Sequence, residues 1–435
     1  MMRFLYNLLF PLAFLLFLPG LLWKLWRRGG EKSNFAERFA QFATRKRRRL
    51  SDGWRGAVWV HAVSVGETVV ALQFIRRWQE RAPGQRFILS TTTTTGQAMA
   101  RGRAPSGVEV IFCPLDFIFF VRPVVNLLQP SLLVIFETEI WPNLILQTQA
   151  RGIPLALANG RMSDKSARGY AKNRWFFRRL FRAFSALCVQ TKEDAERIQQ
   201  VLDTEVHVCN TMKFDQVPDL NRDPAVAAGI QTELERAFGP GERLVFVAGS
   251  THPGEEELMA DTVRELRAGI PSLRMVLVPR HVERTADVEA VLKARGLSYR
   301  LLRNDPGTTT GPVEVLLVNT TGELMNYYAA ADVSYVGKGL AGNEGGHNII
   351  EPAIFGKAIL HGANMQNFRD VARIFREAGA AVEIAADADF APALRRLLTD
   401  ATARAELAQR SRAVVENQRG AIDRTLDLVM PLCQS

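Results

Sequence analysis

The strongest restriction on the fold is a repeated alternation of short apolar runs with longer amphipathic segments. In the first half of the chain, buried strands are predicted at residues 57–63, 86–91, 108–113, 132–136, 154–159 and 186–190. After a break the alternation returns, with apolar runs at residues 244–249, 274–278, 313–318, 333–336 and 358–360. The segments between these runs have helical spacing, for example 68–79 and 254–267. This pattern predicts an α/β fold in which a parallel sheet with helices on both faces is formed twice.

The two halves predict two similar domains with a short connection between them. The stretch 214–224 is polar and contains proline, which is typical of an interdomain linker. We therefore expect a flank at 1–50, a first domain at 51–213, and a second domain with C-terminal helices at 225–435. Two such domains facing each other form a cleft, and parallel sheets bind ligands at the carboxyl ends of their strands.

An apolar segment at residues 4–23 precedes the first domain. Its length is close to the roughly 20 residues that a helix needs to cross a bilayer. A secretory signal peptide is the first alternative, but the run ends in an aromatic and basic flank, Trp23 to Arg28, with no A-x-A cleavage pattern. We predict an uncleaved membrane-anchor helix. Because Pro11 and Pro19 interrupt the run, a helix lying in the membrane interface is the second alternative.

The charge of the chain is unevenly distributed along it. The formal net charge of +10 arises from +9 over residues 1–55, +2 over 56–160, +7 over 161–182 and −8 over the remainder. Because most of the basic residues near the apolar segment follow it, the positive-inside rule predicts that the domains lie on the cytoplasmic face of the inner membrane. The basic block 161–182 also carries aromatic residues at helical spacing, which predicts contact with anionic lipid. A helix that packs on the core and has a solvated face is the alternative, and nucleic acid is not an expected partner because the C-terminal half is acidic.

The cysteines and acidic triplets predict no metal site. The four cysteines are far apart and form no C-x-x-C pair, which fits a reducing compartment. A D-x-D triplet, Asp387 to Asp389, follows a short apolar run late in the chain. We interpret this triplet as a turn and helix cap.

Two acidic motifs follow strands of the first half. In the first, residues 61–67 (His-Ala-Val-Ser-Val-Gly-Glu), Ser64 is a good helix cap, and Glu67 lies near the positive end of the helix. Glu67 is a candidate general base, and an acidic first-turn residue without a catalytic role is the alternative. In the second motif, residues 137–143 (Glu-Thr-Glu-Ile-Trp-Pro-Asn), buried carboxylates are costly unless paired, so they are either functional or paired with a residue such as Arg161.

Small-residue loops follow strands of the second half. Residues 249–254 and 345–353 contain glycines that allow a backbone to approach a phosphate, and the helix expected near Asn348 offers free amide groups. Glu351 is placed to accept hydrogen bonds from ribose hydroxyls. Arg280 is a candidate phosphate ligand, with a surface pair to Glu283 as the alternative. The P-loop pattern G-x-x-x-x-G-K-[ST] is absent, and G-x-G-x-x-G does not follow the first predicted strand, so a dinucleotide is not expected.

Taken together, these motifs resemble the Kdo transferase family, which moves 3-deoxy-D-manno-octulosonic acid (Kdo) from CMP-Kdo to a lipid A precursor. The similarity runs from the anchor to about Phe368 and includes residues 159–163, 212–215, 279–281 and 321–324 besides the motifs above. It implies a GT-B fold, in which one Rossmann-like domain binds the acceptor and the other binds the nucleotide. It also implies an inverting glycosyltransferase of lipopolysaccharide biosynthesis with no cofactor and no metal.

The resemblance assigns roles to individual residues. Glu67 matches the catalytic base, and Glu137 and Lys213 match residues that stabilise the transition state. The residues that match the CMP contacts are Pro279, Arg280, Thr321, Gly322, Glu323, Asn348, Ile349, Ile350 and Glu351. Two positions differ from the family pattern: Ile349 stands where proline is usual, and Lys338 lies between two glycines and could add a charge near the donor.

Two other functions are consistent with parts of the pattern. An enzyme of the same fold could use a UDP-sugar, as a transferase or an epimerase. A membrane-tethered lipid-binding protein without catalytic activity is the second alternative, but the joint presence of Glu67, Glu137, Lys213, Arg280 and Glu351 argues against it.

Overall fold

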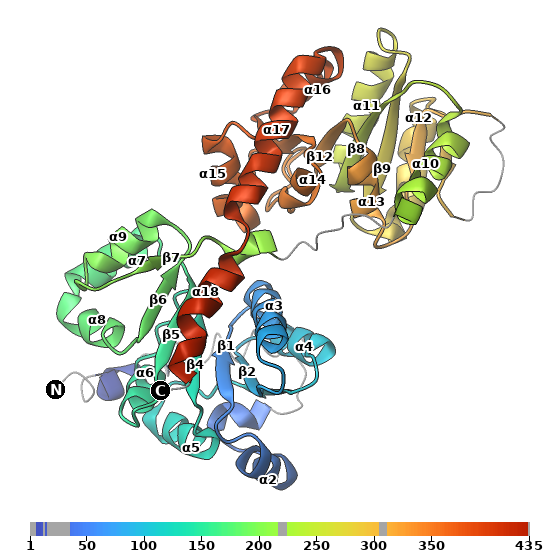
Figure 1. The fold of residues 1–435 in the computed structure, drawn as a ribbon. Helices are drawn as coiled ribbons and strands as arrows, with labels where there is room; N and C mark the ends of the chain where they lie inside the picture. Colours follow the sequence, from blue (N-terminus) through green and yellow to red (C-terminus); the bar gives the residue numbers. More distant parts are fainter. Residues whose placement is uncertain (1–5, 12–13, 15–34, 216–223, 304–310, 434–435) are drawn as a thin grey trace. The chain divides into compact units, whose positions relative to one another are not determined.

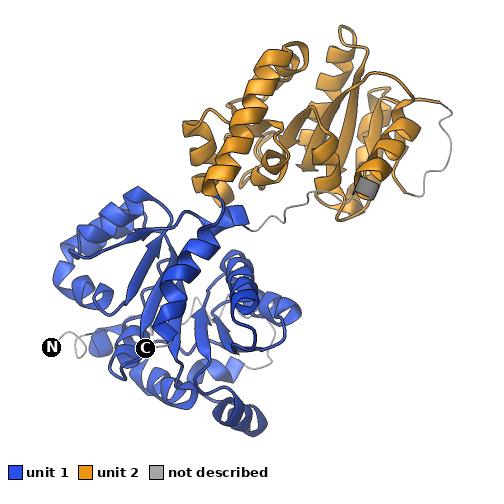
Figure 2. Ribbon diagram, viewed as in Figure 1, with its two compact units in different colours: residues 1–216, 419–435 blue, residues 217–418 orange. Residues whose placement is uncertain are grey.

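The computed structural model describes residues 6–11, 14, 35–215, 224–303 and 311–433. The chain forms two compact units (Figures 1 and 2). Unit 1 contains residues 1–216 and 419–435, and unit 2 contains residues 217–418. The predicted linker, apart from its first two residues and Pro224, lies outside the described residues.

Unit 1 contains a parallel sheet of seven strands in the order β3-β2-β1-β4-β5-β6-β7. The strands are β1 (Val58–His61), β2 (Phe87–Thr91), β3 (Val108–Phe112), β4 (Leu132–Phe136), β5 (Leu155–Gly160), β6 (Ala186–Val189) and β7 (His207–Val208). The apolar runs are continuous because both faces of the sheet are buried. Trp59 faces a core made with α5 (Ile118–Leu128), whereas Val58 and Val60 face α3 (Val65–Arg81).

The other helices of unit 1 are η1 (Phe35–Phe39), α2 (Thr44–Gly53), α4 (Thr94–Arg103), α6 (Pro142–Gln149), α7 (Asp164–Lys172), α8 (Arg174–Phe181), α9 (Lys192–Gln199), η2 (Met212–Asp215), α18 (Ala421–Val429) and η6 (Met430–Cys433). The basic block predicted as one helix is thus two helices, α7 and α8. Leu180 and Phe181 are buried in the core, and Phe177 packs against it. The aromatic face of the block therefore packs on the sheet, as the alternative interpretation expects.

Unit 2 repeats the architecture with the strand order β10-β11-β9-β8-β12-β13-β14, again parallel throughout. Its strands are β8 (Leu244–Thr251), β9 (Leu273–Pro279), β10 (Tyr299–Leu301), β11 (Val315–Leu317), β12 (Val333–Val336), β13 (Ala358–Gly362) and β14 (Val382–Ile384). Its helices are α10 (Pro224–Phe238), α11 (Glu255–Arg267), η3 (Val282–Arg284), α12 (Thr285–Ala294), α13 (Leu324–Ala330), α14 (Ile350–Ile354), η4 (Gln366–Phe368), α15 (Arg369–Glu377), η5 (Asp387–Asp389), α16 (Phe390–Thr399) and α17 (Ala401–Gln418). The predicted α/β fold with two doubly covered parallel sheets is confirmed, and the facing cleft stays a prediction.

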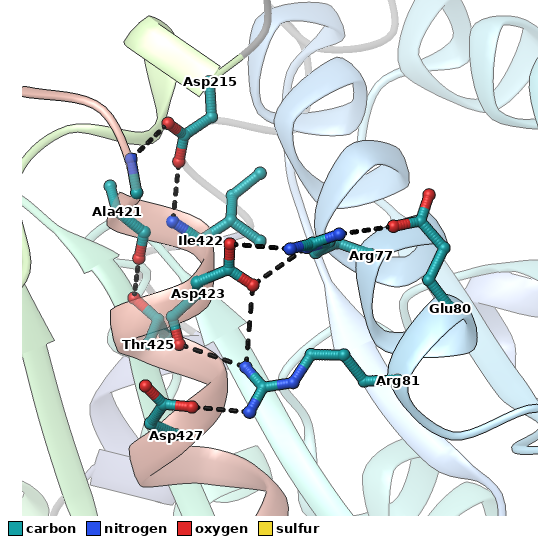
Figure 3. Close-up of polar contacts among 10 residues, drawn as sticks. Arg77, Glu80, Arg81, Asp215, Ala421, Ile422, Asp423, Thr425 and Asp427 are labelled. Carbon is teal, nitrogen blue, oxygen red and sulfur yellow. Dashed lines mark hydrogen bonds and ion pairs between the residues drawn. The ribbon is translucent and has the colours of Figure 1, made fainter. Parts of the chain in front are cut away.

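The end of the chain differs from the predicted domain boundaries. Residues 419–435 were expected in the second domain, but α18 returns to unit 1 and buries Ile422 and Leu426 against the same face of the sheet as α3. Figure 3 shows how it is attached. The Asp215 carboxylate accepts hydrogen bonds from the backbone N–H groups of Gly420 and Ile422, both at 2.7 Å.

Ion pairs on the exposed side of α18 add to this attachment. Arg77 Nε lies 2.8 Å from Asp423, and Arg81 lies 2.5 Å from Asp427. Local patterns predict that a C-terminal helix exists, but they do not determine which sheet it covers. The second domain therefore ends at residue 418 and not at residue 435 as predicted.

The predicted anchor helix lies mostly outside the described residues, which include only 6–11 and 14 of the segment 4–23. Within the part of the chain that the structure describes, no helix combines the length and the apolar character needed to cross a membrane.

Candidate functional site

Glu67 lies in the first turn of α3, immediately after β1. Ser64 and Glu67 form a reciprocal capping box: Ser64 Oγ accepts from Glu67 N at 3.3 Å, and the Glu67 carboxylate accepts from the N–H groups of Val63 (2.8 Å) and Ser64 (3.2 Å). These bonds satisfy amide groups that the start of a helix leaves unpaired. They also fix the position of the carboxylate, which keeps further lone pairs for a ligand. The capping role is present in the structure, and the role as a base stays a prediction.

Glu137 and Glu139 follow β4, the strand beside β1. Glu137 has a φ of 54°, in the left-handed region that non-glycine residues rarely adopt. Such strain is concentrated at functional sites. The pKa of Glu139 is raised to about 7, first by burial and then by the neighbouring Glu67 and Glu137 carboxylates. These three residues, here called the acidic cluster, therefore lie close enough to influence one another at one edge of the sheet.

Lys213 lies at the same edge. The Asn159 side chain at the end of β5 accepts a hydrogen bond from Met212 N at 3.0 Å, and this bond holds η2, which carries Lys213. Asn159 is 1% exposed and has a φ of 53°. Because β5 pairs with β4, the structure brings Lys213 to the side of the sheet where the acidic cluster lies.

In unit 2, a buried carboxylate that the sequence analysis did not single out organises the loop after β12. Glu255, at the start of α11, is fully buried. Its carboxylate accepts hydrogen bonds from five groups: the N–H groups of Lys338 (2.9 Å), Gly339 (3.0 Å), Leu340 (3.1 Å) and His252 (3.0 Å), and the Tyr335 hydroxyl (2.6 Å). The sequence signal that could have identified Glu255 is its position directly after the turn at Gly254. Burial raises the pKa of Glu255, and these bonds oppose the rise.

The loop after β12 passes very close to the loop after β8. A Cβ on Gly337 would lie 2.3 Å from the Ser250 carbonyl oxygen, so only glycine fits there. Lys338, in the position where the family pattern differs, has a φ of 72°, and its carbonyl accepts from Gly346 N at 2.9 Å. The lysine is thus built into the glycine loop at residues 337–347.

Two histidines face each other beside this loop. His252 Nε2 and His347 Nε2 are 2.9 Å apart, and their rings stack with centroids 5.2 Å apart. The pKa of each is lowered to about 4, first by burial and then by nearby cations that include Lys338 and Arg280. Both imidazoles are therefore neutral near pH 7, with one donating a hydrogen bond and the other accepting it.

The predicted nucleotide residues lie at the carboxyl ends of the strands of unit 2. Burial raises the pKa of Glu351 to about 7, while the Asn348 side chain and the Arg280 charge oppose that rise. These three side chains therefore belong to one group. Ile349 and Ile350 are fully buried, so only their backbone atoms are available to a nucleotide.

The remaining nucleotide residues lie on neighbouring strand ends. Pro279 ends β9, and the loop Thr321–Gly322–Glu323 leads from β11 into α13. Because β9 and β11 are paired, this loop and Arg280 occupy the same edge of the sheet.

The D-x-D triplet forms a turn and cap, as predicted. Asp389 accepts from Ala386 N at 3.2 Å, and Asp387 accepts from Ala341 N at 2.9 Å. The described residues contain no group of three or more histidine, cysteine or acidic side chains placed to hold a metal ion. All four cysteines are free thiols.

Comparison with known proteins gives the family. A family model described as 3-deoxy-D-manno-octulosonic-acid transferase (kdotransferase) matches residues 33–216. The chain is 34% identical to the 3-deoxy-D-manno-octulosonic acid transferase of Bordetella pertussis over 430 residues, which cover 93% of this chain and 94% of that protein. It is 31% identical to the transferase of the same name from Haemophilus influenzae, over 86% of each chain.

Solved structures with low identity share the fold. The UDP-GlcNAc 2-epimerase from Neisseria meningitidis matches with a TM-score of 0.56 and 11% identity, over 86% of this chain and 100% of that one. MurG from Acinetobacter baumannii matches with a TM-score of 0.56 and 14% identity, over 87% and 99% of the two chains. With two seven-stranded parallel sheets of the GT-B type and relatives at this level of identity, the chain belongs to the Kdo transferase family of glycosyltransferases.

Proposed function

We propose that this glycosyltransferase moves Kdo from CMP-Kdo to a lipid A precursor, lipid IVA, with inversion at the anomeric carbon. The family supports the transferred sugar. The observation that carries the proposal is the group at the end of the unit 2 sheet: Arg280, Asn348 and Glu351 beside two neutral histidines. A guanidinium is suited to a phosphate, and a carboxylate is suited to ribose hydroxyls. These groups match the chemistry of a nucleoside monophosphate.

In the proposed reaction, Glu67 removes the proton from an acceptor hydroxyl. The oxygen then attacks the anomeric carbon of Kdo, and the bond from that carbon to the CMP phosphate breaks. Glu137 and Lys213 stabilise the charge that develops in the transition state. Arg280 and the amide groups near Asn348 stabilise the negative charge that appears on the CMP phosphate.

The acceptor also determines where the enzyme works. A lipid A precursor is an anionic lipid, so we place the enzyme at the cytoplasmic face of the inner membrane. Exposed basic side chains on α2, among them Arg45, Arg47 and Arg48, support this location, as do those on α7 and α8. Each basic residue near an anionic surface contributes about 1 kcal/mol of attraction.

The proposal is tested by incubating the full-length protein with CMP-Kdo and tetraacylated lipid A precursor and analysing the product by mass spectrometry. We expect addition of Kdo by the parent protein and a loss of about 10³-fold in kcat for Glu67→Gln. Glutamine keeps an oxygen that can accept in the capping box, so α3 stays capped. CMP binding, measured by calorimetry, is expected to be unchanged.

Ser64→Ala is the matched control. It removes the other half of the capping box and costs about 1 kcal/mol of stability, but it leaves the carboxylate in place. Transfer by Glu67→Gln at the parental rate would overturn the role as a base. Inhibition of the parent by UDP but not by CMP would instead favour a UDP-sugar enzyme.

A further inference from the structure

The first described residues of the chain pack on unit 1 through specific polar contacts. The Tyr6 hydroxyl donates a hydrogen bond to Asp116 Oδ2 at 2.8 Å. The side-chain amides of Asn7 and Asn143 bond reciprocally, at 3.1 and 2.9 Å. Asp116 is 3% exposed and Asn143 is 1% exposed. The folded protein loses stability when a buried polar group is left without its hydrogen-bond partner. These contacts therefore favour one docked position of residues 6 and 7.

The partners of Tyr6 and Asn7 determine how α6 begins. Asp116 accepts hydrogen bonds from the N–H groups of Asn143 and Leu144, both at 2.9 Å. Trp141, the residue before the helix, provides no side-chain cap, so Asp116 takes over that role from the loop after β3. Only the short connection at residues 137–141 separates these amides from β4, and it contains Glu137 and Glu139 of the acidic cluster. Tyr6 and Asn7 therefore contact Asp116 and Asn143, the residues that hold the end of the loop carrying Glu137 and Glu139.

Aromatic contacts continue along the segment in the same direction. Phe10 lies 5.1 Å from Phe117, and Phe14 meets Phe117 edge to face at 5.2 Å, both measured between ring centroids. Tyr6 also stacks on Phe10 at 5.1 Å. Leu8 and Leu9, between these contacts, are each 52% exposed. One side of the described residues 6–11 and 14 thus faces unit 1, and Leu8 and Leu9 present apolar surface on the other side.

These contacts bear directly on the topology of the segment. If residues 4–23 crossed the bilayer with the domains in the cytoplasm, Tyr6 and Asn7 would lie at the far end of the span. A helix rises 1.5 Å per residue, so that end would be roughly 25 Å from the cytoplasmic side. Side chains at such a distance cannot bond to Asp116 and Asn143.

We propose that the described start of the N-terminal segment, residues 6–11 and 14, is a monotopic element docked on unit 1, where Tyr6 and Asn7 position the loop that carries Glu137 and Glu139. Leu8 and Leu9 are the side that meets the lipid. Tyr6 and Asn7 are positioning residues, because they act on the reacting groups through Asp116 and Asn143. The catalytic part of this inference rests on the proposed function, and the topological part does not.

The first experiment tests the docked position without an activity measurement. In native membranes, Phe10→Cys paired with Phe117→Cys is treated with a short bis-maleimide, and the cross-linked peptides are detected by mass spectrometry. We expect an intramolecular cross-link. Phe10→Cys paired with Val208→Cys, on an exposed position of β7, is the control and is expected to give none. Absence of the first cross-link, with both single cysteines still labelled by a monofunctional maleimide, would overturn the docked position.

The second experiment tests positioning with the protein in detergent, where attachment to a membrane does not limit the rate. We expect Tyr6→Phe combined with Asn7→Ala to lower kcat about tenfold while the KM for the donor is unchanged. Amide hydrogen exchange at residues 143–144 is expected to become faster. Leu8→Ala combined with Leu9→Ala is the matched control, and it is expected to weaken binding to anionic vesicles without altering kcat.

The pH profile of kcat is a further measurement that distinguishes positioning from packing. Burial raises the pKa of Asp116 to about 7, while the hydrogen bonds from Asn143 N, Tyr6 and Leu144 N lower it. Cys113 also lies near Asp116, and Arg38 and Glu139 lie near Cys113. Loss of the Tyr6 hydroxyl is therefore expected to move the acidic limb of the profile to higher pH.

Two outcomes would overturn the positioning role. The first is an unchanged rate of amide exchange at residues 143–144 in the variant Tyr6→Phe/Asn7→Ala. This outcome counts against positioning even if the parent shows no transfer from CMP-Kdo. The second is an active parent whose kcat is the same as that of the variant Tyr6→Phe/Asn7→Ala. An inactive parent together with faster exchange would count against the proposed function and not against the docked segment.

Discussion

The two units have the same architecture but opposite chemistry at the carboxyl ends of their strands. Each contains a seven-stranded parallel sheet. At the edge of unit 1, the acidic cluster gathers carboxylates, and burial raises the pKa of one of them. At the edge of unit 2, burial first and then cations that include Arg280 and Lys338 lower the pKa of two histidines. Our proposal assigns a proton acceptor to one unit and an anion site to the other, and the loops rather than the sheets carry this difference in charge.

The largest expected effect on substrate binding tests whether the anion site belongs to unit 2. We expect Arg280→Gln to raise the KM for CMP-Kdo about 100-fold, because a charge-assisted bond to phosphate is lost from a preorganised site. The KM for the acceptor should not change. Steady-state kinetics with each substrate varied in turn is the measurement, and an increase only in the acceptor KM would reverse the assignment of the two units.

The second effect tests whether Glu255 organises the glycine loop. We expect Glu255→Ala to destabilise unit 2 by about 3 kcal/mol, since several buried N–H donors would lose their acceptor. Urea unfolding followed by hydrogen exchange in the two units separates the changes. Glu257→Ala, on the same helix α11, is the control, and equal losses in the two variants would contradict the role of Glu255.

The third effect tests the electrostatics of the acidic cluster. The pKa of Glu139 is about 7 in the folded protein against an ordinary value of 4.5. A raised carboxyl pKa means that the folded state binds the proton more tightly, so this group reduces stability as the pH rises from about 4.5 to 7. We therefore compare the free energy of unfolding of Glu139→Gln with that of the parent. The difference is expected to shift in favour of the variant as the pH rises from about 4.5 to 7, and to stay constant above that range. A difference that does not depend on pH would show that the folded protein does not raise the pKa of Glu139.

The smallest effects concern the attachment of α18. We expect Asp215→Ala to cost about 1 kcal/mol, because it removes a charged acceptor from the start of the helix. Arg77→Ala should cost less, since ion pairs between exposed side chains contribute about 0–1 kcal/mol. Thermal unfolding at low and high salt measures both, and a larger cost for Arg77→Ala would reverse their order.

The sequence predicted the central strands well, because their apolar runs are buried on both faces. The runs at 132–136 and 358–360, for example, coincide with or lie within β4 and β13. It did not predict β7, β10 and β14, which lie at or near the sheet margins and are only two or three residues long. Such short strands carry too few residues for a periodic signal.

The candidate site could be predicted only in part, because much of it depends on contacts between distant residues. The motifs around Glu67, Arg280 and Glu351 follow strands, so their positions at the sheet edges could be inferred. The role of Glu255 could not be inferred in this way, because its carboxylate bonds to the backbone of Lys338, which lies 83 residues later in the chain. The bond between Tyr6 and Asp116 spans 110 residues and has no local sequence signal.

The return of α18 makes unit 2 an insertion within unit 1 when the chain is followed from end to end. The two points where the chain leaves and re-enters unit 1 are held together by the bond between Asp215 and Gly420. Insertions are tolerated where the ends of a domain are close. Residues 217–418 could therefore be excised and replaced by a short turn to give unit 1 in isolation, whereas a simple cut at residue 216 would remove α18 and uncover one face of the remaining sheet.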